Sequence, residues 1–113
     1  MTEELMTIRE NSDVIIVDLK KDVGNQVASE LGETLGELVG KKPPKIAVNL
    51  GNVEHINSAA VGSLVVVARR MRQKGGDVKI YGLAEHLQRI FDRIGASRIV
   101  EIYESEGRAI AAF

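Results

Sequence analysis

The hydroxyl of Ser58 is the group in this sequence best placed to do chemistry, because it opens a helical pattern. Apolar residues follow it at the three- and four-residue spacing of an amphipathic helix, at Val61, Leu64, Val65, Ala68 and Met71. A serine at this position predicts an N-cap, whose hydroxyl accepts a first-turn N–H and contributes about 1 kcal/mol. A phosphate on the same hydroxyl would meet free N–H groups and the positive end of the helix dipole. Ser58 is therefore a candidate both for a structural cap and for a phosphorylation site.

Few other groups have the type and spacing of a catalytic or metal site. The sequence has no cysteine, which excludes disulfides, thiol catalysis and cysteine-ligated metals. His55 and His86 have no second ligand at metal-binding spacing, so we expect surface or packing roles for both. His55 lies three residues before Ser58, and it could also contact a partner protein. No GxGxxG or GxxxxGKS/T motif follows a predicted strand. We expect no enzyme activity, metal or cofactor; only the fold class, which hosts many functions, would suggest a small-molecule binder.

Charge and composition limit the classes of partner. Fifteen basic residues against sixteen acidic ones give a net charge of −1, so no overall field attracts nucleic acid or anionic lipid. A nucleic-acid surface would also need more aromatic residues than two Phe, two Tyr and no Trp. The basic run over 69–74 is expected to be the solvated C-terminal end of a helix. We expect a partner protein to be recognised locally.

Length and apolar content predict one domain over residues 1–113. Apolar residues make up 44% of the chain and charged residues 27%, which suits a globular fold with its own core. No window approaches the roughly 20 apolar residues of a membrane span, and the N-terminus lacks a signal-peptide pattern. We expect a cytoplasmic protein.

The elements that must position Ser58 follow from the periodicity of the apolar residues. Alternation and short β-branched runs predict strands around 6–8 and over 14–19, 45–50, 77–81 and 99–103. Helical spacing predicts helices over 27–39, 58–71, 83–94 and 108–112. Glycines and prolines mark their ends, with Gly40 and Pro43-Pro44 after the first helix and Gly95 after the third.

This order predicts an α/β fold: a mixed, mostly parallel β-sheet with amphipathic helices packed on it. The first two strands form a hairpin through Asn11-Ser12-Asp13, and the second is apolar enough to be buried on both faces. Helices between the later strands require right-handed crossovers, which make 45–50, 77–81 and 99–103 parallel, with 45–50 central. The functional surface of such a sheet lies beyond the carboxyl ends of its strands. That rule points to the loop from Gly51 to Ser58.

Three glycines in the first helix recur every four residues, at Gly32, Gly36 and Gly40. Each interior glycine costs about 1 kcal/mol relative to alanine, so we expect a compensating contact. Two explanations are open: a close approach of this helix to the sheet or a neighbouring helix, and a flat face for self-association. Charged residues between the glycines exclude a membrane helix pair.

Three segments of the chain carry a recognisable pattern: IIVDLKKDV, KIAVNLGNVEHINSAAVGSLVVVARRMRQKGGDVKIYGL and RIGAS. They resemble STAS domains, the family typified by bacterial anti-sigma factor antagonists, and the resemblance covers nearly the whole chain. The middle segment is similar to the family pattern DLSxVxxIDSSGLGxLxxxxRRxRxxGGxLxLxGL. In that family the serine after the aspartate is phosphorylated by a partner kinase, which is itself the anti-sigma factor. Ser58 is the matching residue here.

The resemblance implies an anti-sigma factor antagonist that works by partner switching. The unphosphorylated form would bind an anti-sigma factor serine kinase, the phosphorylated form would release it, and a phosphatase would restore the first state. We expect a monomer or weak homodimer. The predicted partner-binding residues are Asp22, Gly24, Asn25, His55, Ile56, Asn57, Ser58, Ala59, Ala60 and Val61.

The sequence departs from the family pattern beside the predicted phosphorylation site. Asn57 replaces the aspartate, Ala59 the second hydroxyl residue and Ala60 a glycine. Loss of a carboxylate that orients the serine would slow phosphoryl transfer. The loop over 21–24 also differs from the family's GxLD. The alternative function is thus a non-switching STAS interaction module or scaffold subunit, in a stress-signalling assembly or a lipid-transport complex.

Overall fold

A computed structural model describes residues 5–20, 22, 24–38 and 45–113, apart from the side chains of 25–28 and 38. Five strands form one sheet in the order β1-β2-β3-β4-β5. The strands are β1 (Met6–Asn11), β2 (Val14–Leu19), β3 (Lys45–Asn49), β4 (Asp77–Tyr81) and β5 (Glu101–Tyr103). The helices are α2 (Asn25–Leu38), α3 (Ser58–Gln73), α4 (Glu85–Ile94), the 3₁₀-helix η1 (Ala96–Arg98) and α5 (Glu106–Ala111).

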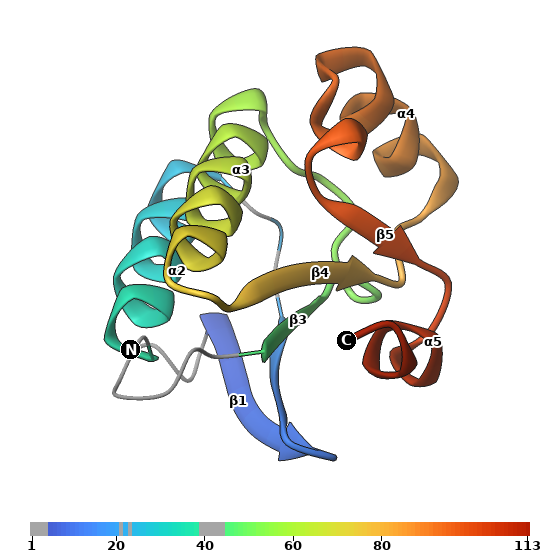
Figure 1. Ribbon diagram of the computed structural model, residues 1–113. Coiled ribbons are helices and arrows are strands. Elements are labelled where there is room, and N and C mark those ends of the chain that lie inside the picture. The colour runs from blue at the N-terminus through green and yellow to red at the C-terminus, as the bar shows by residue number, and fades with distance from the viewer. Residues whose placement is uncertain (1–4, 21, 23, 39–44) are drawn as a thin grey trace.

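The sheet is mixed and mostly parallel, as predicted. β1 pairs antiparallel with β2, while β2, β3, β4 and β5 pair parallel in turn. β3 therefore lies at the centre of the sheet, and the α/β fold class is confirmed. Because α2 and α3 each connect one parallel strand to the next, they run side by side in the same direction (Figure 1).

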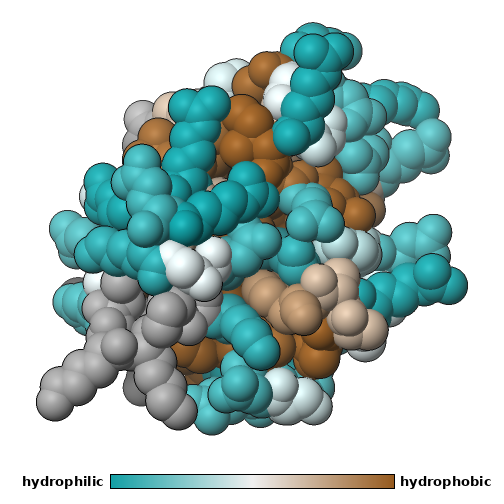
Figure 2. All heavy atoms as spheres, viewed as in Figure 1, coloured by the Kyte–Doolittle hydropathy of each residue, from teal (hydrophilic) through white to brown (hydrophobic). Residues whose placement is uncertain are grey.

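Two apolar clusters lie on the two faces of the sheet. The larger one joins inward side chains of the sheet to α2, α3 and α4, including Leu31, Leu64 and Phe91. The smaller one packs Ala109 of α5 against the other face. β2 contributes Val17 to the first cluster and Ile16 to the second, which confirms its predicted burial on both faces. Figure 2 shows hydrophilic side chains over most of the visible surface, with apolar surface exposed between them beside α3.

The last strand is shorter than predicted, because the chain makes an extra turn before it enters the sheet. Gly95 ends α4 in the left-handed conformation, with φ 87°, and η1 follows directly. The N–H groups of Ile99 and Val100 donate to the carbonyl of Ala96 and so are not available for pairing with β4. Two helices that were predicted to start at residues 83 and 108 start at Glu85 and Glu106 instead. Gly40 and Pro43-Pro44 lie outside the described residues.

No helix among the described residues is long and apolar enough to cross a membrane.

Candidate functional site

Ser58 is the first residue of α3, and the N-cap is Asn57 rather than Ser58. Asn57 has extended backbone angles, and its side-chain oxygen accepts the N–H of Ala60 at 2.8 Å. The prediction of a serine cap is therefore wrong by one residue. Asparagine caps a helix as well as serine does, since its carbonyl oxygen reaches the third N–H of the first turn. Ser58 keeps its hydroxyl outside the cap, on an exposed residue.

The first turn of α3 has two N–H groups for which no acceptor is recorded in the described part of the chain. The N–H of Ala60 is used by the cap, and the N–H of Val61 donates to the carbonyl of Asn57. Within the described part of the chain, no acceptor is recorded for the N–H groups of Ser58 and Ala59. Both residues are exposed. The site thus offers a hydroxyl next to free donors at the positive end of a 16-residue helix.

The loop between β3 and α3, residues 50–57, is held from two sides. The carboxylate of Asp22 accepts the N–H groups of Glu54 and His55, at 3.0 and 3.1 Å. On the other side His86, at the start of α4, lies 2.6 Å from the carbonyl oxygen of Glu54 through Nε2. Two segments that are distant in the sequence therefore fix the loop that leads to Ser58. His86 was missed as a positioning residue, since its contact is made to backbone and leaves no sequence pattern.

A hollow of about 240 Å³ lies beside Ser58. It is lined by Asp22, Gly24, His55, Ile56 and Asn57. All five are among the predicted partner-binding residues, so the fold brings together two loops that the sequence separates by about 30 residues. Asn25, also predicted, begins α2 directly after this loop. His55, Asn57 and Ala59 are exposed, whereas Ile56 is 8% exposed and forms the base of the surface.

Two predicted partner-binding residues lie in the core and not on this surface. Ala60 is 1% exposed and Val61 is fully buried, and both pack into the larger apolar cluster. They sit on the inner side of α3 because helix geometry turns successive residues by about 100°. Their role is to anchor the first turn of α3 against the sheet.

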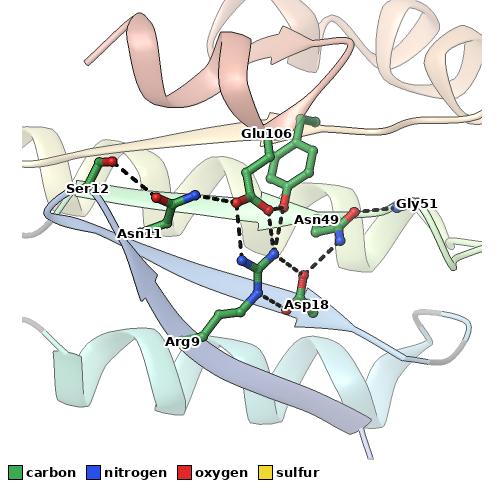
Figure 3. Close-up of polar contacts among 8 residues, drawn as sticks. Arg9, Asn11, Ser12, Asp18, Asn49, Gly51 and Glu106 are labelled. Carbon is green, nitrogen blue, oxygen red and sulfur yellow. Dashed lines mark hydrogen bonds and ion pairs between the residues drawn. The ribbon is translucent and has the colours of Figure 1, made fainter.

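A polar cluster, which sequence reasoning did not find, joins the ends of the strands to α5 (Figure 3). Arg9 of β1 donates to Asp18 at 2.7 Å and to Glu106 of α5, and Tyr81 donates to Glu106 at 2.9 Å. The amide of Asn49 donates to Asp18 at 2.8 Å and accepts the N–H of Gly51 at 2.9 Å. The cluster therefore extends from α5 to Gly51, in the loop that carries the chain to Ser58.

The electrostatics of this cluster follow from its hydrogen bonds. The guanidinium of Arg9, with a smaller contribution from Asn11, lowers the pKa of Glu106 from its ordinary 4.5 to about 2. The hydrogen bond from Arg9 likewise lowers the pKa of Asp18. Burial, followed by the hydrogen bond to Glu106, raises the pKa of Tyr81. At neutral pH the cluster thus holds one cation between two carboxylates, with the phenol protonated.

No group of three or more His, Cys, Asp or Glu side chains that could hold a metal ion occurs among the described residues.

The cap assignment predicts a difference between neighbouring substitutions. Asn57→Ala is expected to lower the free energy of unfolding by about 1 kcal/mol, because it leaves the N–H of Ala60 without its acceptor. Asn57→Asp should keep the cap and stay within about 0.5 kcal/mol of the unmodified chain, as should Ser58→Ala. Urea denaturation followed by circular dichroism measures all three. A larger loss for Ser58→Ala than for Asn57→Ala would contradict the assignment.

Comparisons with known proteins agree with one another. The STAS domain family model matches residues 6–109. A curated relative, the putative anti-sigma factor antagonist BtrV of Bordetella bronchiseptica, is 27% identical over 108 residues, which cover 96% of this chain and 93% of the relative.

Solved structures share the fold. The crystal structure of a putative anti-sigma factor antagonist from Thermotoga maritima superposes with a TM-score of 0.85 at 22% identity, covering 95% of this chain and 92% of that one. The structure of the Bacillus cell fate determinant SpoIIAA in the phosphorylated form gives a TM-score of 0.71 at 12% identity, covering 95% and 97%.

Proposed function

We propose that this chain, which belongs to the STAS domain family, acts as an anti-sigma factor antagonist and binds an anti-sigma factor kinase through the surface around Ser58. The relative from Bordetella bronchiseptica carries the name of that role. The proposal takes residues 1–113 as one domain, since a single sheet contains all five described strands. The sheet edge at the carboxyl ends of β2 and β3 is where such a fold presents its loops.

One observation carries the proposal: Ser58 lies exposed at the start of α3, beside the hollow formed by two loops. The docking surface consists of the exposed residues His55, Asn57, Ser58 and Ala59, with the buried Ile56 beneath them. Asp22 and His86 hold the loop in shape through its backbone. A surface held this way is ready for a partner without a large ordering cost.

Phosphorylation of Ser58 would act as the switch. The hydroxyl oxygen attacks the γ-phosphorus of ATP in the kinase, the bond from that phosphorus to the bridging oxygen breaks so that ADP leaves, and the hydroxyl proton passes to a base of the kinase. The product is a phosphoserine with close to two negative charges, which the free N–H groups of the first turn and the helix dipole stabilise. The fold is therefore kept, while the docking surface gains charge that a closely packed partner cannot solvate. Release of the kinase follows, and a phosphatase would reverse the step.

Asn57 is expected to slow the transfer of phosphate to Ser58. Its side chain is committed to the cap through Oδ1, and an amide cannot accept a proton from the serine as a carboxylate can. The kinase must then supply the base, so we expect slow transfer to Ser58 and faster transfer in an Asn57→Asp chain. The cap itself does not depend on which of the two residues is present.

The alternative function is a non-switching interaction module or scaffold subunit. The exposed Ala59 and the uncharged Asn57 favour it, because both place apolar or neutral groups where the family pattern has a hydroxyl and a carboxylate. A scaffold would use the same docking surface, and its partner would bind irrespective of charge at Ser58.

A binding titration separates the two functions. Calorimetry with a cognate anti-sigma factor kinase is expected to show a dissociation constant at least about tenfold higher for Ser58→Asp than for the unmodified chain, equal to about 1.4 kcal/mol. The control is Ser63→Asp, one turn and a residue further along α3, where the hydroxyl donates to the carbonyl of Ala59 at 3.1 Å. Equal affinity for the Ser58→Asp chain and the unmodified chain would reject the switch and support the scaffold.

A further inference from the structure

The glycines of α2 are not explained by contacts within the chain. A Cβ built at Gly32 or Gly36 would meet no heavy atom within 4 Å. A close approach of this helix to the sheet or to α3 therefore does not account for these two positions. Glycine destabilises a helix interior, because it loses more backbone freedom than alanine on folding. The open space beside them leaves room for a contact from outside the chain.

That open space is a groove of about 720 Å³ between α2 and α3. It is lined on α2 by Ser29, Gly32, Glu33 and Gly36, and on α3 by Ala59, Gly62, Ser63, Val66, Val67 and Arg70. Small residues keep the groove open on both sides. Val66 stands at it with 53% of its surface exposed, one of three large apolar side chains exposed in the described part of the chain. The groove thus has open space beside its glycines and an exposed apolar side chain, Val66.

The two helices that form the groove carry opposite charges. Glu33 lies on α2 and Arg70 on α3, both are at the groove, and no ion pair is recorded for either among the described residues. A second copy turned about an axis along the groove would place its α3 over α2 of the first copy, and its α2 over α3. Each acidic helix would then face a basic one. The charges of the groove are therefore complementary to those of the same groove in another copy.

The shape of the groove favours the same arrangement. Gly32 and Gly36 of α2 and Val66 of α3 line the same groove, and the two glycines leave space there for a side chain from another copy. In the two-fold arrangement, Val66 of each copy faces that space on the other copy. A two-fold interface of this kind repeats every contact twice.

We propose that the groove between α2 and α3 is a self-association surface that holds α3 of a second copy, with Val66 packed between Gly32 and Gly36 and Arg70 facing Glu33. This goes beyond the proposed docking of a kinase and does not depend on it, since neither Ser58 nor a kinase takes part. The interface is built on one pair of apolar knobs and two ion pairs, which is typical of a weak, reversible dimer.

Sedimentation equilibrium of the full chain tests the proposal. From about 10 μM to about 1 mM we expect the average mass to rise from one copy towards two, as for a dimer of micromolar to millimolar affinity. Gly36→Leu should raise the dissociation constant about tenfold or more, because the new side chain fills the hole for Val66. The same substitution improves the helix, so its urea midpoint should rise, which separates lost association from lost folding. Val66→Ser should weaken the dimer to a similar extent.

Charge reversal identifies the occupant. Glu33→Arg and Arg70→Glu should each abolish self-association, and an equimolar mixture of the two variants should associate again as a mixed dimer. A single-copy mass up to the highest concentration would overturn the proposal. So would unchanged association in Gly36→Leu, or a groove that binds an acyl-chain detergent or a different protein while the chain stays monomeric.

Discussion

Ser58→Ala is expected to lose all phosphate that a cognate anti-sigma factor kinase adds to this chain in the presence of ATP. The unmodified chain should gain one phosphate per molecule, because Ser58 is an exposed hydroxyl beside free first-turn N–H groups. Intact-mass spectrometry counts the phosphates. The rate of phosphate addition, compared with the rate for Asn57→Asp, gives the effect of Asn57. The loss should be complete rather than partial, since the hydroxyl is itself the acceptor.

Two controls define this result. Ser63→Ala removes a hydroxyl from the same helix that is already bonded to the carbonyl of Ala59, and it should be phosphorylated like the unmodified chain. Both alanine variants should unfold at nearly the same urea concentration as the unmodified chain, because neither hydroxyl caps α3. A phosphate that persists in Ser58→Ala would place the switch elsewhere. No phosphate on the unmodified chain with any cognate kinase would favour the non-switching scaffold.

Arg9→Met is expected to cause the largest loss of stability among single substitutions outside the core, about 2 kcal/mol in the free energy of unfolding. Hydrogen bonds to charged groups contribute about 1.5 to 3 kcal/mol when buried, and the value is reduced here because the cluster is partly exposed. The side chain of Arg9 is 41% exposed, and those of Asp18 and Glu106 are 19% and 26% exposed. Its removal leaves two carboxylates without their shared cation. Denaturant unfolding at pH 7 measures the loss.

The pH dependence gives this prediction a direction. The folded pKa of Glu106 lies at about 2, below its ordinary 4.5, so its contribution is present above pH 4.5 and is lost as the pH falls towards 2. The depressed pKa of Asp18 acts in the same sense. The difference in stability between the unmodified chain and Arg9→Met should therefore be full at pH 7 and shrink steadily below pH 4.5.

A matched control removes an exposed cation of the same type. Arg89 pairs with Glu85 one turn away on α4, with 68% and 84% of the two side chains exposed. Arg89→Met should change the free energy of unfolding by no more than about 0.5 kcal/mol. An equal loss in the two variants, or a difference for Arg9→Met that does not depend on pH, would contradict a structural role for the cluster.

Local patterns were sufficient to predict most of the fold. The apolar run over 14–19 and the helical spacing after Ser58 each describe one element, and an element's own residues determine which of its sides are buried. The right-handed crossover rule then predicted that the last three strands are parallel. The cap was misplaced because Asn57 and Ser58 are both good N-caps, and only the backbone angles distinguish them. The shorter β5 depended on a turn after Gly95 that apolar periodicity does not report.

The sequence alone was enough to predict the α/β class, the parallel strands with 45–50 at the centre, the helix that starts at Ser58 and the family pattern that makes Ser58 a candidate switch. Only the tertiary structure decided what surrounds that serine. The contacts of Asp22 and His86 with the loop are made to backbone atoms, and the cluster around Arg9 joins residues up to 97 positions apart. The groove beside Gly32 and Gly36 likewise exists only because two helices lie side by side. Such contacts depend on distance in space, and local periodicity carries no record of which distant segments the folded chain brings together.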